Sequence, residues 1–174
     1  LMATVGGVDI LVNNAGVTRD RSLLKMSDDE WQTVIDIHLK GMWLGCQHAV
    51  PSMRERGGGA IVNVSSTGID APHPGIGMYA LTKAAVAMLT MTAAVEAGEY
   101  GIRVNSIAPG MTVTPFTTWR LYKPDGTLDQ QAYDDFLEFS RAQSPLGIVG
   151  EPVDQALLIH YLLCDASKYA TGNI

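Results

Sequence analysis

The sequence predicts an α/β fold built around a parallel sheet that helices cover on both faces. Three observations support this prediction: short runs rich in valine and isoleucine alternate with longer helical segments, the first two runs are largely apolar, and small or polar residues follow each run. Continuous apolar runs are typical of parallel strands that are buried on both faces. Alternation of such strands with helices favours crossover connections over hairpins.

The predicted strands are two short apolar runs, at residues 8–12 and 60–64, and a third run at residues 102–107. Each run has the length of a strand and is rich in valine or isoleucine, which pack well in sheets. The third run stops before Pro109 and Gly110, because proline cannot donate to the hydrogen-bond ladder of a strand.

Helices are predicted between these strands. Ser27 and Glu30 form a capping box, in which the two residues exchange hydrogen bonds at the start of a helix. This helix continues through Trp43 and ends before Gly57. A second helix, rich in alanine, methionine and leucine, is predicted from residue 79 to about residue 98.

The pattern loosens between residues 112 and 146, where prolines and an Asp-Gly pair interrupt it. One or two helices are predicted within residues 128–143. Pro152 suits the first turn of a last helix that runs to about residue 164. The sequence therefore predicts a single domain over residues 1–174.

Composition excludes several classes of function. The formal net charge is −6, and no basic cluster predicts a surface for nucleic acid or for anionic lipid. The longest apolar stretch, residues 84–95, is too short and too rich in threonine to predict a membrane span. Cys46 and Cys164 predict free thiols in a reducing, cytoplasmic compartment, and the spacing of the histidines predicts no metal site.

Tyr79 and Lys83 carry the strongest chemical signal. Residues four apart on a helix share a face, so the phenol and the ammonium are expected to lie close together. A nearby positive charge favours the phenolate and is expected to lower the tyrosine pKa from its usual ~10. Such a tyrosine can exchange a proton with a substrate oxygen near neutral pH.

Small and polar residues at the strand ends add to this signal. Ser66 follows the second strand, residues 13–16 (Asn-Asn-Ala-Gly) follow the first, and Pro109-Gly110 follows the third. The carboxyl ends of parallel strands form the edge of an α/β sheet where ligands bind. A serine hydroxyl there can hold a carbonyl oxygen while Tyr79 supplies its proton.

Four motifs resemble the short-chain dehydrogenase/reductase family. They are Asn-Asn-Ala-Gly at 13–16, Val-Asn-Val-Ser-Ser at 62–66, Tyr-Ala-Leu-Thr-Lys at 79–83 and Arg-Val-Asn-Ser-Ile-Ala-Pro-Gly at 103–110. Residues 13–20 are also similar to the 3-oxoacyl-carrier-protein reductase branch of that family. The resemblance implies the second half of a doubly wound, Rossmann-like sheet, with a substrate-covering lid at about residues 114–144.

The resemblance further implies a nicotinamide-dependent oxidoreductase. Tyr79 is then the general acid/base, Ser66 orients the substrate oxygen, and Lys83 lowers the tyrosine pKa and binds the ribose hydroxyls of the nicotinamide. The substrate is a small carbonyl compound or alcohol, and the chain pairs into a homodimer or homotetramer through its two long helices. The residues expected to contact the cofactor, NAD or NADP, are Asn13, Ala15, Gly16, Tyr79, Lys83, Pro109, Gly110, Thr112 and Thr114.

The sequence departs from the family pattern in three places. His38 replaces a helix asparagine whose backbone carbonyl holds a water in a proton relay to the lysine, so His38 is expected to be catalytic in a modified relay. The glycine-rich loop that binds the pyrophosphate does not occur, and neither does the last strand, which would follow Ile174. These departures predict a chain that is truncated at both ends.

Three functions remain open at this stage. The leading one is an oxidoreductase that transfers a hydride between NAD(P)(H) and a carbonyl or secondary alcohol. The alternative is a truncated, non-catalytic subunit or fragment of such an enzyme. A sugar-nucleotide epimerase or dehydratase also uses Tyr-x-x-x-Lys, but the motif at residues 13–16 and the short C-terminal region count against it.

Overall fold

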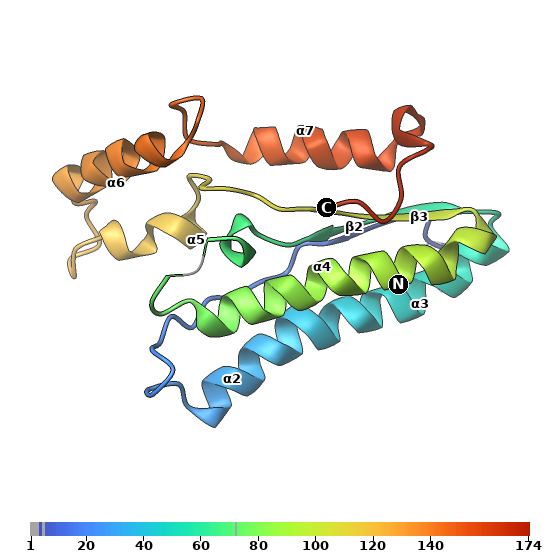
Figure 1. Ribbon diagram of the computed structural model, residues 1–174, viewed down its shortest axis with the longest axis horizontal. Helices are drawn as coiled ribbons and strands as arrows, with labels where there is room; N and C mark the ends of the chain where they lie inside the picture. The colour runs from blue at the N-terminus through green and yellow to red at the C-terminus, as the bar shows by residue number, and fades with distance from the viewer. Residues whose placement is uncertain (1–3, 5, 72) are drawn as a thin grey trace. The chain divides into compact units, whose positions relative to one another are not determined.

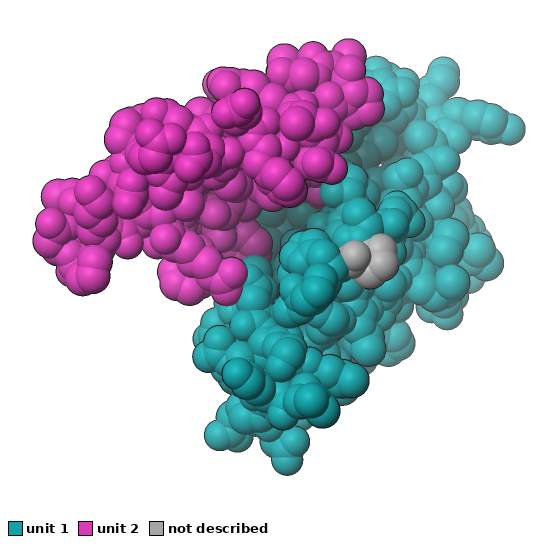
Figure 2. All heavy atoms as spheres, turned by 60° about the vertical axis from the view of Figure 1, so that its left-hand side comes forward, with its two compact units in different colours: residues 1–108, 158–174 teal, residues 109–157 magenta. Residues whose placement is uncertain are grey.

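The computed structural model describes residues 4, 6–71 and 73–174. Their contacts divide the chain into two compact units, which Figure 2 distinguishes by colour. Unit 1 comprises Leu1–Ala108 and Leu158–Ile174, and unit 2 comprises Pro109–Leu157. The second boundary between the units falls inside a helix, α7 (Pro152–Leu163), and the single domain over residues 1–174 stays a prediction.

Unit 1 contains a parallel sheet of three strands in the order β1-β2-β3, which confirms the predicted fold class. Val62 in the central strand lies opposite Val12 on one side and Asn105 on the other. This register brings the carboxyl ends of the strands to one edge. The strands and the long helices of unit 1 are β1 (Ile10–Asn13), α3 (Gly41–Glu55), β2 (Gly59–Val64), α4 (Gly77–Ala97) and β3 (Ile102–Ile107).

Helices cover both faces of the sheet, because alternate residues of each strand point to opposite sides. On one face, α3 and α4 lie side by side and bury Ile61 and Val104 (Figure 1). On the other face, Leu162 of α7 packs with Val62 and Ile107. The predicted two-sided covering is therefore present within unit 1.

The predicted long helix after residue 27 is present, but it is interrupted. Ser27 and Glu30 form the expected capping box, and α2 (Asp28–Ile35) follows it. A π-helical turn, η1 (Asp36–Lys40), separates α2 from α3. Such turns occur frequently at functional sites. His38 lies in this turn.

The remaining elements are short, apart from α6 (Gln130–Gln143), a long helix that lies wholly in unit 2. That helix is the one predicted within residues 128–143, and the last helix begins at Pro152 as predicted. The elements are η2 (Thr67–Ile69), η3 (Gly98–Tyr100) and η5 (Asp165–Ser167) in unit 1, and α5 (Pro115–Thr118), η4 (Trp119–Leu121) and α6 (Gln130–Gln143) in unit 2.

Arg103 of β3 caps the C-terminal end of α7. Its guanidinium donates to the carbonyl oxygen of Leu162 at 2.7 Å and to the hydroxyl of Ser167 at 2.8 Å. It also donates to the carbonyl oxygens of Leu163 and Cys164, both at 3.3 Å. The last carbonyls of a helix have no partner within the helix, and a cation there opposes the negative end of the helix dipole.

Replacing Arg103 by methionine should lower the free energy of unfolding by about 2–3 kcal/mol, because these carbonyls lose charge-assisted hydrogen bonds. Urea denaturation at neutral pH measures the change. Arg19→Met is the matched control, since Arg19 is exposed and donates to the carbonyl of its neighbour Thr18. Equal losses in the two variants would contradict the capping role of Arg103.

The segment Gly77–Tyr100, formed by α4 and η3, is long and apolar enough to cross a membrane by length and composition. This finding corrects the expectation from sequence, which considered only residues 84–95. A core helix of a soluble protein passes the same test. Thr82, Lys83 and Thr90 of α4 are buried and hydrogen-bonded within unit 1, which is the pattern of a core helix.

Candidate active site

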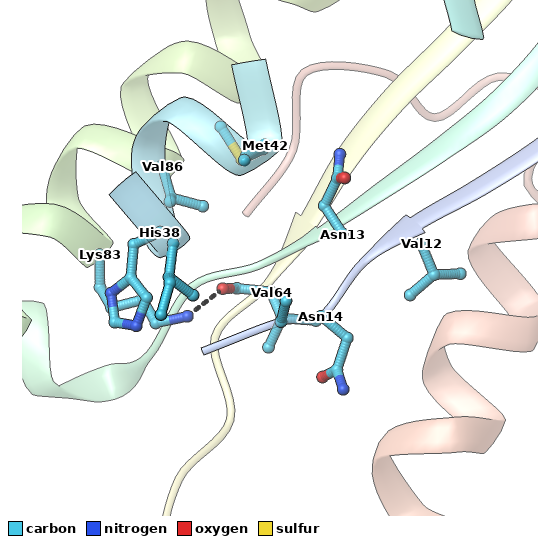
Figure 3. Close-up of a pocket in the computed structure, with 11 residues that line it drawn as sticks. Val12, Asn13, Asn14, His38, Met42, Val64, Lys83 and Val86 are labelled. Atoms are coloured by element: carbon cyan, nitrogen blue, oxygen red, sulfur yellow. Dashed lines mark hydrogen bonds between the residues drawn. The ribbon is translucent and has the colours of Figure 1, made fainter. Parts of the chain in front are cut away.

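A cavity of about 150 Å³ lies at the carboxyl end of the sheet in unit 1 (Figure 3). Its walls come from β1 and the loop after it, from the π turn, from the end of β2 and from α4. Parallel topology brings these elements to the same edge of the sheet. The lining residues are Val12, Asn13, Asn14, Ala15, Ile37, His38, Gly41, Met42, Val64, Lys83 and Val86.

Tyr79 lies in the first turn of α4, and its hydroxyl is hydrogen-bonded to that of Ser66, which follows β2. Burial raises the pKa of Tyr79 above its usual value, the bond to Ser66 opposes this rise, and Asp20 adds to it. The expected lowering of this pKa is therefore wrong for this structure. The ammonium of Lys83 is 5.7 Å from the centre of the tyrosine ring, and burial is the largest cause of the raised pKa.

Lys83 lies between the sheet and the cavity. It is only 5% exposed, and its Nζ donates to the carbonyl oxygen of Val64 at 2.7 Å, as Figure 3 shows. Burial lowers the pKa of the ammonium to about 8, so most of it is charged at neutral pH. An ammonium has three N–H donors, and Lys83 can therefore also donate to a ligand hydroxyl in the cavity that it lines.

His38 is buried, and both of its ring nitrogens have partners. The backbone N–H of Val17 donates to Nε2 at 2.9 Å, and Nδ1 lies 2.7 Å from Oγ1 of Thr82. Thr82 in turn donates to the carbonyl oxygen of Tyr79 at 2.8 Å. Burial, with the nearby ammonium of Lys83, lowers the pKa of His38 to about 4. The imidazole is therefore neutral at pH 7.

The small size of Gly16 permits this arrangement. A Cβ at Gly16 would lie 3.3 Å from Nε2 of His38 and 3.8 Å from Nζ of Lys83, so a side chain there would crowd the cavity wall. On the other side of the imidazole, the ring of Tyr79 meets it edge to face, with the centroids 5.6 Å apart. The loop, the π turn and α4 are thus in direct contact.

The side chain of Asn13 is engaged within the protein. Its Nδ2 donates to Oδ1 of Asn63 at 2.8 Å, and Nδ2 of Asn63 donates to Thr90 at 2.9 Å. A Cβ at Gly45 would come within 2.6 Å of the Asn13 Oδ1, so α3 closes over this amide. Asn13 therefore braces the end of the sheet, and the exposed Asn14 is the side chain of this pair that is free to meet a ligand.

The other four predicted cofactor contacts, Pro109, Gly110, Thr112 and Thr114, belong to unit 2. The hydroxyl of Thr112 donates to the carbonyl oxygen of Gly110 at 3.2 Å. The backbone N–H of Thr114 donates to the hydroxyl of Thr117 at 3.1 Å, at the start of α5. Both hydrogen bonds are local and stabilise the backbone of residues 110–117.

Two residues of the site are missed by the sequence argument. Val17 and Thr82 both bind His38, yet neither belongs to the residues singled out by chemistry. The position of Thr82 inside the Tyr-x-x-x-Lys motif is a signal that could have found it. Val17 acts through its backbone, so its side chain carries no such signal.

One of the two cysteines, Cys46, contacts the site, since its Sγ accepts a hydrogen bond from Nδ2 of Asn13 at 3.6 Å. Cys46 and Cys164 are free thiols, as predicted. Burial raises the pKa of Cys46, which keeps the thiol protonated and unreactive at neutral pH. Within residues 4, 6–71 and 73–174, no group of three or more histidine, cysteine, aspartate or glutamate side chains could hold a metal ion.

Comparison with known proteins adds independent information. The family model described as enoyl-(acyl carrier protein) reductase matches residues 1–174. A 3-oxoacyl-(acyl-carrier-protein) reductase of Staphylococcus epidermidis is 40% identical over 173 residues, which cover 99% of this chain and 66% of that protein. A protein of the same name from Thermotoga maritima is 40% identical over 169 residues, 97% of this chain and 64% of that protein.

A relative with a different activity is almost equally similar. The 3β-hydroxysteroid dehydrogenase 1 of Eggerthella lenta is 39% identical over 173 residues, which cover 99% of this chain and 62% of that protein. The chain thus spans between 62% and 66% of the length of these three relatives. Because the matches cover nearly the whole chain, they include every residue that lines the cavity.

Proposed function

This chain belongs to the short-chain dehydrogenase/reductase family, and we propose on that basis that it transfers a hydride between NAD(H) or NADP(H) and a carbonyl or secondary alcohol. The observation that carries the proposal is the hydrogen bond between the hydroxyls of Ser66 and Tyr79. The ammonium of Lys83, which lines the cavity, lies 5.7 Å from the Tyr79 ring. Two hydroxyls that converge in this way can hold one substrate oxygen between them.

Each of these side chains has a role in the proposed reaction. Ser66 donates a hydrogen bond to the substrate oxygen and orients it. Tyr79 gives that oxygen its proton during reduction, and takes the proton back during oxidation. The raised pKa of Tyr79 keeps the phenol protonated at neutral pH, so the unliganded site is ready for reduction.

The residues around the cavity fit a nicotinamide cofactor. Lys83 supplies N–H donors for ribose hydroxyls, and the missing side chain at Gly16 lets the backbone of the loop approach a ligand closely. In the proposal, Asn13, through its backbone, and Ala15 and Gly16 line the adenosine side of the cofactor. The bound nicotinamide donates or accepts the hydride. The family resemblance assigns further proposed cofactor contacts to Pro109, Gly110, Thr112 and Thr114.

The relatives define which substrates to test first. One is named as a 3-oxoacyl-(acyl-carrier-protein) reductase and another as a 3β-hydroxysteroid dehydrogenase, and both names describe a ketone or its secondary alcohol. The full-length protein should oxidise NADH or NADPH when supplied with a 3-oxoacyl thioester or a 3-oxosteroid. Loss of the absorbance of the reduced nicotinamide measures this. Turnover of no ketone, together with no measurable binding of NADH or NADPH, would favour the alternative of a truncated, non-catalytic subunit that cannot hold a cofactor.

The rate of reduction should fall as the pH rises above about 8. Burial disfavours the charged form of Lys83, and its pKa of about 8 means that the ammonium is lost above this pH. Below this pH the charge is present and the rate should be level. The pH profile of kcat/KM for reduction measures the effect, with exposed Lys168→Met as the control. A rate that stays constant to about pH 9.5 would contradict the role of the Lys83 charge.

The proposed protein is a cytoplasmic homodimer or homotetramer that pairs through α3 and α4. These helices expose large apolar side chains, which a second copy would cover. Light scattering of the purified protein measures the oligomeric state. The exposed side chains are Trp43 and Leu44 on α3, and Met88, Met91 and Val95 on α4.

A further inference from the structure

The imidazole of His38 connects two parts of the site. One ring nitrogen accepts from the backbone of Val17, in the loop after β1, and the other contacts Thr82, within the catalytic turn of α4. The hydroxyl of Thr82 in turn donates a hydrogen bond to the backbone carbonyl of Tyr79. A side chain that is 2% exposed and bonded at both ends has little freedom to move.

The direction of these hydrogen bonds determines which nitrogen carries the proton. The backbone N–H of Val17 can only donate, so Nε2 of His38 must accept and is unprotonated. In the neutral ring the proton is then on Nδ1, which donates to Oγ1 of Thr82. The Thr82 hydroxyl remains free to donate to the carbonyl oxygen of Tyr79. Each of the three donors in this series of hydrogen bonds thus has one acceptor.

We propose that the side chain of His38 is a positioning group, which locks the loop at residues 14–17 to the turn of α4 that carries Tyr79 and Lys83 and exchanges no proton with the reaction. Nε2 accepts from a backbone N–H, and Nδ1 donates to a hydroxyl that itself donates to the backbone carbonyl of Tyr79, so the hydrogen bonds of the ring lead to backbone groups and not to the reacting proton. The low pKa of the ring, about 4, agrees with this assignment. A relay through the backbone carbonyl of residue 38 remains compatible with it.

The hydrogen bonds from Val17 to His38 and from His38 to Thr82, called the lock below, join the proposed cofactor loop to the turn that carries the proposed acid. Gly16 and Val17 lie on one side of the ring, and Thr82 and Tyr79 lie on the other. Lys83 and Tyr79 are the titratable groups that face the ring from α4. Loosening of the ring should therefore weaken both cofactor binding and proton transfer, because the ring fixes the loop and the turn of α4 relative to each other.

The first test is independent of turnover. Nitrogen NMR of the full-length protein with labelled histidine should show His38 as a neutral ring with the proton on Nδ1 throughout about pH 5.5–8. His38→Asn identifies the signal, since the chain has four histidines. A ring protonated on Nε2, or one that titrates within this range, would overturn the proposal whether or not the protein is an oxidoreductase.

The second test rests on the proposed function and uses variants that each keep half of the lock. The amide nitrogen of asparagine can replace Nδ1 and keep the contact with Thr82, whereas the amide oxygen of glutamine can replace Nε2 and keep the contact with Val17. Both variants should lower kcat/KM by about tenfold and raise the cofactor Kd, and His38→Ala should lower kcat/KM further. The shape of the pH profile should stay unchanged in all three.

Combination with Thr82→Val separates positioning from a general loss of packing. Thr82→Val should lower kcat/KM in the wild type and in the His38→Asn background. The fold-loss in kcat/KM should be at least about threefold smaller in the His38→Gln background, because only His38→Gln has already lost the contact between residue 38 and Thr82. Equal costs in all three backgrounds would refute the lock. His48→Asn, at an exposed position of α3, is the control and should match the wild type. Activity of His38→Ala within twofold of the wild type would also refute the lock.

Discussion

Replacing Tyr79 by phenylalanine should lower kcat at least tenfold, and by our expectation about a thousandfold, while the cofactor Kd changes little. The substitution removes only the hydroxyl that bonds to Ser66, and with it the transferable proton. A thousandfold loss corresponds to about 4 kcal/mol of transition-state stabilisation. The aromatic ring remains, so its edge-to-face contact with His38 is kept.

Steady-state kinetics with the best ketone substrate, together with fluorescence titration of the reduced cofactor, measure these two quantities. Tyr169→Phe is the matched control, because Tyr169 is fully exposed and should tolerate the same chemical change. If the Tyr79→Phe variant kept more than about a tenth of the wild-type kcat, a cost below ~1.4 kcal/mol, Tyr79 would not be the general acid.

Replacing Lys83 by methionine should lower kcat/KM about a hundredfold and yet leave the protein as stable as the wild type or more stable. The activity falls because the cavity loses its cationic donor. The stability does not fall because the pKa of Lys83 is about 8, below the 10.5 of a free lysine, so folding disfavours the charged form. This penalty is fully present below pH 8 and disappears as the pH rises to 10.5.

The size of the stability gain follows from two opposing effects. Relief of the buried charge is worth about 3 kcal/mol at neutral pH, and loss of the hydrogen bond to Val64 costs about 1–2 kcal/mol. Urea denaturation at pH 7 should therefore show a gain of up to about 2 kcal/mol, and the gain should shrink toward pH 10. A variant that is both inactive and clearly less stable would show that Lys83 holds the fold rather than the chemistry.

Local signals were sufficient for much of the fold. The strands, the capping box at Ser27 and the proline at the start of α7 are all present where the sequence predicts them, within one or two residues. These features depend on neighbours in the chain: apolar runs for the strands, and a side chain three residues from its partner for the capping box. The π turn at residues 36–40 was not foreseen, because no residue pattern marks it.

The candidate site was predicted in its parts but not in its contacts. Ser66, Tyr79 and Lys83 converge because strand ends and the start of α4 share one edge of the sheet, which the alternation of strands and helices implies. The direction of the shift in the Tyr79 pKa was not predictable, because it depends on burial, and burial is a property of the folded chain.

The sequence by itself determined the parallel sheet, the order of its helices and the three side chains that meet at its edge, because periodicity and spacing act over short distances along the chain. Only the tertiary structure decided how His38 is used. Its partners lie 21 and 44 residues away, at Val17 and Thr82, and one of them is a backbone group with no signature in the sequence. Contacts between distant segments form when helices and strands pack, and packing is what assigned this imidazole its partners and its neutral state.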